Sequence, residues 1–248
     1  MSLGLEVAIL PGFALARRID VEGDWKRQLM LSPALGLLAC LGLAGFCFIL
    51  ELSLGTLTTL LIMANVAAAI AIRVEINPEP RRVNIERSPW FWIFTTIACF
   101  IAITPLSYMR PMGVDWIGFA SLTDSISRTG GFILSDPSIG EWIYPPAFPM
   151  LAAWLGGPAH LSVFWLGVMC FVALLLGIAA VGDKMGCGHW TIMAMLLAPA
   201  LFAKNLDSGF PTVASQLGLV VILMMFGEKL RWEIVATTAA IVAMIHPT

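Results

Sequence analysis

Charged residues are scarce in this chain. Only 12% of its 248 residues are Asp, Glu, Lys or Arg, whereas 59% are hydrophobic, and the mean hydropathy is +0.89. Soluble domains carry about 25% charged and about 45–50% apolar residues, so this composition excludes a soluble globular domain. The net charge of −2 offers no general electrostatic surface for nucleic acid, and we expect no nucleic-acid partner.

Motifs of several enzyme classes are missing as well. The sequence has no G-x-x-x-x-G-K-[ST], no G-x-S-x-G, no H-E-x-x-H and no dinucleotide-type glycine pattern, which counts against nucleotide hydrolysis and zinc proteolysis. Its five cysteines form no C-x-x-C pair, and we expect free thiols that pack as small hydrophobic residues. We expect no charge in the middle of a spanning helix, where ion pathways and proton relays need one, and this disfavours a pump or channel.

Long uncharged runs dominate the sequence instead. A helix of about 20 apolar residues crosses a hydrocarbon core of roughly 30 Å, so membrane lipids are the expected surroundings. The first run contains Glu6 and Pro11 and is expected to be tilted, kinked or only partly inserted. The predicted fold is all-α, a polytopic transmembrane bundle of about eight helices, at 3–16, 29–50, 54–73, 89–107, 158–182, 190–204, 212–227 and 233–246.

Lys and Arg are distributed unevenly between alternate loops. One set of loops holds eleven of the 14 basic residues, and the other holds only Arg110, Arg128 and Lys204. Cytoplasmic loops are enriched in positive charge, so we expect a multi-pass membrane protein with loop 108–157 outside. The proline-containing linker 74–88 divides an N-terminal extension, 1–73, from the rest.

Loop 108–157 is the long polar stretch outside the predicted spans. Between Asp115 and Arg128, apolar residues recur at near-helical spacing, which predicts an amphipathic helix that ends at Gly130 and Gly131. Two interpretations of Asp115 stay open: it caps this helix, or its carboxylate is a general base or metal ligand at the membrane surface. Segment 144–157 begins with two prolines and is short for a span, so we expect it at the outer interface, as a helix that lies in the interface or re-enters from one side.

Taken together, the outer acid, the amphipathic helix with its TGGF turn and the Tyr144-Pro145-Pro146 segment resemble the GT-C superfamily of membrane glycosyltransferases. The likeness covers roughly 89–248, and 1–73 is similar to N-terminal extensions of uncharacterised prokaryotic members. The resemblance implies sugar transfer from a polyprenyl-phosphate-linked donor at the outer face of a prokaryotic inner membrane. It also implies that Asp115 is catalytic and that Tyr144 contacts substrate.

Further contacts are weaker predictions. Arg110, Arg128 and Lys204 would compensate phosphate charge, and the alternative for each is a cation whose side chain merely reaches the interface. Asp207 would contact donor or acceptor, or is simply a turn residue. Many family members have two acids within three residues in the first outer loop, but here no second acid follows Asp115 until Asp124, so the use of a divalent metal, Mg or Mn, stays open.

A different class of function also fits the sequence. The family core usually has more helices, so we expect a fragment, a split half or a shortened relative. The alternative to an enzyme is a non-catalytic accessory or scaffold subunit, whose helices pack against partner membrane subunits. A solute transporter ranks third, because paired broken helices are not apparent.

Overall fold

The structure is all-helical throughout the part of the chain that it describes. This computed structural model covers residues 3–21, 23–75, 88–108, 115–131, 145–198, 202–203, 209–226 and 231–246, which contain ten α-helices, one 3-10 helix and no strand. The helices are α1 Leu3–Ile19, α2 Trp25–Ile49, α3 Leu54–Glu75, α4 Pro89–Ile103, η1 Thr104–Tyr108, α5 Trp116–Thr129, α6 Ala147–Leu155, α7 Ala159–Lys184, α8 Gly188–Leu196, α10 Phe210–Met224 and α11 Trp232–Ile245. The predicted fold class is confirmed as all-α.

Four of these helices are long and apolar enough to cross a membrane. They are α2, α3, α7 and α4 together with the start of η1. Each of the eight predicted spans overlaps a helix, although α8 ends at Leu196 and is shorter than the predicted 190–204. Helices α5 and α6 are additional and lie in the predicted outer loop.

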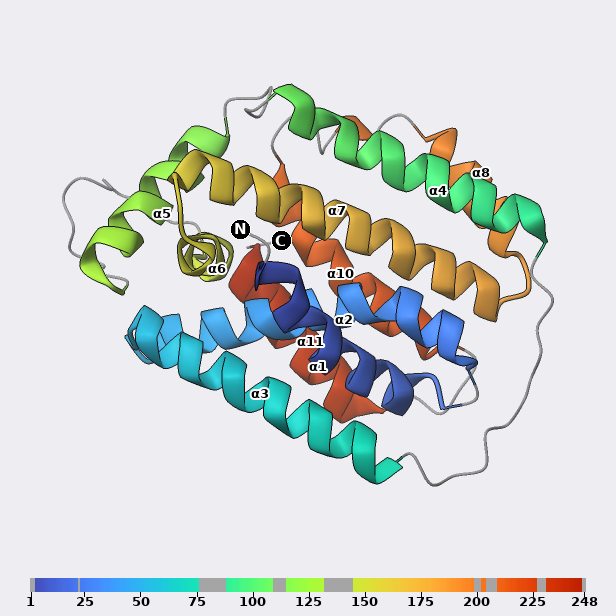
Figure 1. Ribbon diagram of the computed structural model, residues 1–248, viewed down its shortest axis with the longest axis horizontal. Coiled ribbons are helices and arrows are strands. Elements are labelled where there is room, and N and C mark those ends of the chain that lie inside the picture. Colours follow the sequence, from blue (N-terminus) through green and yellow to red (C-terminus); the bar gives the residue numbers. More distant parts are fainter. Residues whose placement is uncertain are drawn as a thin grey trace.

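The long helices lie side by side across the molecule (Figure 1). Helix α7 packs against α2 and α10 on one side and against α4 and α8 on the other. Helix α1 packs along α2 and also contacts α3, which forms an edge of the bundle. Helix α11 closes the bundle against α10 and α2.

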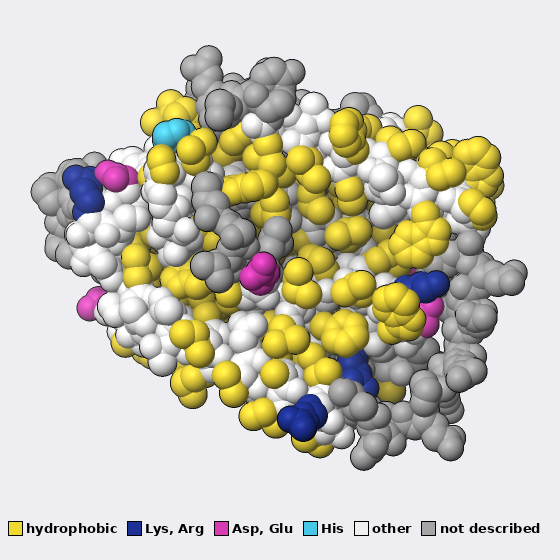
Figure 2. Space-filling view, viewed as in Figure 1, with side chains coloured by type: hydrophobic (Ala, Val, Ile, Leu, Met, Phe, Trp, Pro, Cys, Tyr) yellow, Lys and Arg dark blue, Asp and Glu magenta, His cyan; other side chains and the backbone are white. Residues whose placement is uncertain are grey.

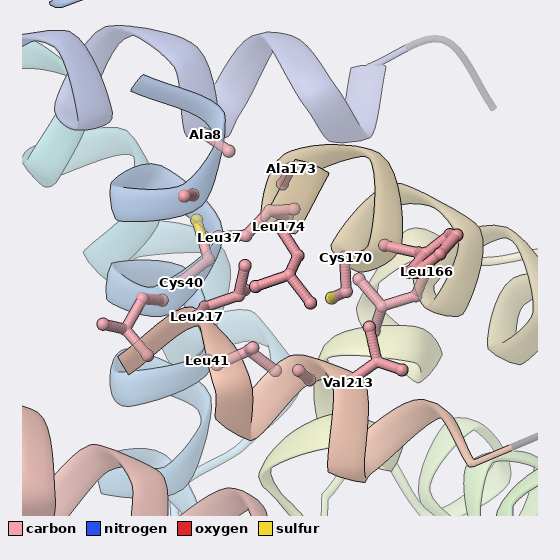
Figure 3. Close-up of a cluster of buried hydrophobic side chains, with 14 of the residues drawn as sticks. Ala8, Leu37, Cys40, Leu41, Leu166, Cys170, Ala173, Leu174, Val213 and Leu217 are labelled. Atoms are coloured by element: carbon pink, nitrogen blue, oxygen red, sulfur yellow. The ribbon is translucent and has the colours of Figure 1, made fainter. Parts of the chain in front are cut away.

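One hydrophobic core joins the parts of the chain before and after the 74–88 linker. Its centre contains Cys40 and Leu41 from α2, Cys170 from α7 and Leu217 from α10, all of them buried (Figure 3). The N-terminal helices therefore pack into the same core as the later ones. Residues 76–87 of the linker lie outside the described residues, and the predicted domain boundary stays a prediction.

Two glycines allow α1 and α2 to cross in backbone contact. A Cβ atom added to Gly12 would lie 1.9 Å from the carbonyl oxygen of Ser32, and one added to Gly36 would lie 1.8 Å from that of Ala8. Any larger residue at these positions would push the helices apart. Small residues at such spacing let helix backbones approach closely in membranes.

A proline in α1 creates a second link, this time to α3. Pro11 has no backbone N–H, so the carbonyl of Val7, four residues earlier, loses its helical partner. The side-chain amide of Asn65 on α3 donates a hydrogen bond to that oxygen at 3.0 Å. The expected disturbance at Pro11 is thus compensated by a polar side chain of a neighbouring helix.

The bundle has two chemically different ends. We call the end with the α1–α2 turn and the C-termini of α7 and α10 the turn end, and the opposite end the α5–α6 end. Among the eight Lys and Arg residues whose side chains are described, Arg128 alone lies at the α5–α6 end, and the other seven lie at the turn end. Hydrophobic side chains cover most of the face between the ends in Figure 2.

Candidate functional site

Helix α5 forms the outer edge of the α5–α6 end. Phe119, Leu122 and Ile126 are buried on one side, as the spacing predicted. The helix ends at Gly130, which has a φ of 72°, a left-handed conformation that favours glycine. The carbonyl of Gly130 accepts a hydrogen bond of 2.8 Å from the backbone N–H of Leu54, which fixes α5 to the start of α3.

Asp115 immediately precedes α5 and does not cap it. Its backbone has φ −62° and ψ −28°, and its side chain makes no capping hydrogen bond. A capping residue needs an extended backbone to turn its side chain toward the first N–H groups of the helix, so the capping interpretation is wrong. The carboxylate is exposed at the α5–α6 end, and its catalytic role stays a prediction.

His160 is a neighbour of this position that sequence reasoning left without a role. Its ring centroid lies 6.4 Å from that of Trp116, the residue after Asp115. His160 is exposed at the start of α7. Its sequence position showed only that it begins a helix, and the packing of α5 against α7 was needed to place it beside α5.

Aromatic side chains from several helices pack against one another beneath this end. Phe148 of α6 contacts Phe119 of α5, with ring centroids 6.2 Å apart, and Phe210 of α10 at 6.4 Å. Phe164 of α7 contacts Phe210 at 6.1 Å. Four helices are therefore held together below Asp115 and His160.

Arg128 does not share a site with Asp115. The two residues are 13 positions apart on one helix, which separates them by about 20 Å at 1.5 Å per residue. Arg128 instead pairs with Asp124 at 3.0 Å on an exposed surface. Asp124 is itself about 13 Å along the helix from Asp115, so α5 does not bring these two acids together.

The described residues contain no cluster suited to a metal ion. Among them, no group of three or more His, Cys, Asp and Glu side chains lies close enough to hold one. Of the other predicted contacts, Arg110, Tyr144, Lys204 and Asp207 lie outside the described residues.

Helix α6 is short, as predicted, but protein surrounds it. All residues from Ala147 to Ala153 are buried against α2, α5 and α7, and the helix runs across the long helices, end-on in Figure 1. Trp154 donates a hydrogen bond of 3.0 Å to the hydroxyl of Thr58 on α3. This nine-residue helix is too short to cross a bilayer, and its place at the outer interface stays a prediction.

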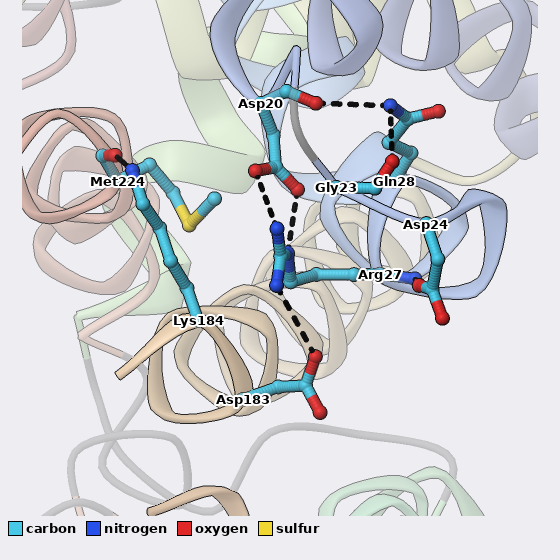
Figure 4. Close-up of polar contacts among 8 residues, drawn as sticks. All are labelled: Asp20, Gly23, Asp24, Arg27, Gln28, Asp183, Lys184 and Met224. Atoms are coloured by element: carbon cyan, nitrogen blue, oxygen red, sulfur yellow. Dashed lines mark hydrogen bonds and ion pairs between the residues drawn. The ribbon is translucent and has the colours of Figure 1, made fainter. Parts of the chain in front are cut away.

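A buried ion cluster occupies the turn end (Figure 4). The guanidinium of Arg27 donates two hydrogen bonds, of 2.6 Å and 2.8 Å, to the carboxylate of Asp20, and lies 3.7 Å from that of Asp183 on α7. Lys184 donates to the backbone carbonyl of Met224 on α10. Sequence reasoning counted Arg27 and Lys184 only as loop cations. Asp183 is far from Arg27 in the sequence, and no sequence pattern marks Asp20 as its partner.

Glu6 lies on α1 roughly halfway along the bundle. Ala8 packs on Gly36 in the middle of α2, and Val7 meets Asn65 in the middle of α3. The Glu6 side chain is exposed at this depth. Glu6 lies in the first turn of α1, so the expectation that no charge lies mid-helix is not contradicted, although α1 begins beside the middle of its neighbours.

Comparisons of the chain with models of known protein families, with curated proteins and with solved structures gave no match.

Proposed function

We propose that this chain is a multi-pass protein of a prokaryotic inner membrane, with the turn end in the cytoplasm and the α5–α6 end outside. The proposal is supported by the four long apolar helices and by the placement of seven of the eight described basic side chains at one end.

Cysteine labelling in intact cells tests this orientation. Lys26 and Asp124 are exposed at opposite ends of the bundle and can each be changed to Cys in a background without the five native cysteines. A membrane-impermeant thiol reagent should react at position 124 and not at position 26. Reaction at 26 alone would reverse the orientation, and reaction at both positions or at neither would refute insertion in the single orientation proposed.

At the α5–α6 end we propose transfer of a sugar from a polyprenyl-phosphate-linked donor to an acceptor hydroxyl. In this reaction Asp115 accepts the hydroxyl proton, and the acceptor oxygen forms a bond to the anomeric carbon. The bond from that carbon to the phosphate oxygen breaks, and polyprenyl phosphate leaves. Arg110 and Lys204 would compensate the phosphate charge, Tyr144 and Asp207 would contact the substrates, and Arg128 lies too far along α5 to take part.

The observation that carries this proposal is the exposed carboxylate of Asp115, which has no capping bond to maintain. Because Asp115→Asn removes a proton acceptor without removing a helix cap, it should lower transfer by about 10²–10⁴-fold and leave stability unchanged. Radiolabelled sugar transfer in membrane vesicles measures the first effect, and thermal unfolding measures the second. Asp124→Asn on the same helix is the control, and equal activity of Asp115→Asn and wild type would refute the catalytic role.

A non-catalytic subunit of a membrane complex is the second candidate, and Glu6 favours it. An ionised carboxylate exposed at mid-depth is unfavourable against lipid by roughly 2.5–3.5 kcal/mol, so a partner helix that brings a hydrogen-bond donor or cation would stabilise it. Absence of transfer by wild-type protein with every donor tested, together with loss of a co-purifying partner on Glu6→Leu, would favour this candidate over the enzyme.

A further inference from the structure

Three acids of the turn end are arranged around Arg27. Asp20 and Asp183 face Arg27, and their side chains are only 1% and 5% exposed. Asp24 accepts a hydrogen bond of 2.8 Å from the backbone N–H of Arg27. These three carboxylates therefore surround and fix Arg27, whose single charge compensates only part of theirs.

The cations of the same end face outward. Arg18, Lys26 and Arg73, from the end of α1, the start of α2 and the end of α3, are all exposed. The helix ends are held together, because Arg17 of α1 donates to the backbone carbonyl of Ile72 on α3 at 3.5 Å. Glu233 is also exposed at this end but pairs with Arg231, so exposed cations outnumber exposed acids among the described side chains of this surface.

Exposed apolar side chains lie beside these cations. Val21, Trp25 and Val74 are 75%, 62% and 73% exposed, and the ammonium group of Lys26 lies 5.8 Å from the centroid of the Trp25 ring. A free anion such as inorganic phosphate would gain nothing from this apolar surface. A phospholipid presents both a phosphate and the upper part of its acyl chains, and so matches both features.

We propose that the turn end, through Lys26, Arg73 and Trp25, is a binding surface for the headgroups of anionic phospholipids of the cytoplasmic leaflet. The inference rests on the membrane orientation proposed above and goes beyond it, because it assigns a preferred lipid to one surface. The cations lie on separate helix ends around the α1 terminus, so the surface accommodates several headgroups and is not a single pocket. Each basic residue near an anionic surface contributes about fivefold to binding.

Lipid titration of the purified full-length chain tests the proposal. In neutral detergent, phosphatidylglycerol should raise the unfolding temperature more than phosphatidylcholine at equal concentration, and sodium phosphate should not reproduce the effect. Changing Lys26 and Arg73 together to Gln should raise the apparent dissociation constant for phosphatidylglycerol about 25-fold. Trp25→Ala should weaken binding of the lipid without creating a response to phosphate.

Two matched controls distinguish lipid binding at this surface from a general effect of the protein's charge. Exchanging the cations, Lys26→Arg with Arg73→Lys, keeps the charge and should keep the affinity. Arg128→Gln removes a basic residue at the opposite end and should also leave the affinity unchanged. Equal effects of the two lipids on wild type, or full retention of the preference by the double Gln variant, would overturn the proposal. Extraction of the wild-type chain from membranes by alkaline carbonate would instead overturn membrane insertion, so the two failures are distinguishable.

Discussion

Replacing Arg27 with Met should be among the most destabilising single changes at the turn end. The guanidinium holds Asp20 at 2.6 Å and Asp183 at 3.7 Å, and all three side chains are at most 7% exposed. Met fills similar volume but leaves two buried carboxylates without their shared cation. Removal of one partner from a buried ion pair typically costs about 3–5 kcal/mol, and we expect a loss of this size in the free energy of unfolding.

Arg231 provides a control with the same chemistry and different burial. Its Nε donates to Glu233 at 2.9 Å, but the two side chains are 54% and 67% exposed. Exposed pairs contribute about 0–1 kcal/mol, so Arg231→Met should have little effect. The comparison isolates burial, because both arginines bind a carboxylate through the same nitrogen.

Unfolding of the purified protein by SDS in mixed micelles, followed by far-UV circular dichroism, measures both losses. Adding Asp20→Leu to Arg27→Met should recover part of the stability, because it removes one of the two stranded carboxylates. If Arg27→Met and Arg231→Met agreed within about 1 kcal/mol, the buried cluster would not stabilise the turn end and the reasoning would be refuted.

Three further changes test other parts of the fold and site. Asn65→Leu leaves the carbonyl freed by Pro11 without a donor and should cost about 1–3 kcal/mol in the same unfolding assay, and less when Pro11→Ala restores the helical N–H. Glu6→Leu should stabilise the isolated protein in vesicles, because it removes a carboxylate exposed at mid-depth, and a loss above about 1 kcal/mol would contradict that placement. If His160 binds substrate phosphate, His160→Gln should slow sugar transfer in the vesicle assay about tenfold. His189 lies beside Trp190 at the opposite end, and His189→Gln should leave the rate unchanged.

Hydrophobic runs predicted the helices well, because length and apolar composition are local properties of the chain. The α5 helix and its end at Gly130 were predicted for the same reason, since amphipathic spacing and a left-handed glycine are both visible in sequence. The basic residues also lie mainly at one end, as the loop count indicated.

Tertiary packing decided what the sequence could not show. Asp115 has the right residue type and position for a cap, but its backbone conformation prevents capping. The burial of α6 depends on α2 and α7, which no periodicity within 144–157 reveals. Glu6 was noted in a short first run, but its depth follows only from the crossing of α1 with α2.

The position of Asp20 and Arg27 in the sequence has a consequence for biosynthesis. Both belong to the α1–α2 hairpin, whereas Asp183 is synthesised more than 150 residues later. The charge of Arg27 can therefore be neutralised by Asp20 within the first hairpin, before Asp183 has been synthesised. Helix α7 is synthesised later and packs against the α1–α2 hairpin. Asp183 then adds a second carboxylate to Arg27, which links α7 to this hairpin.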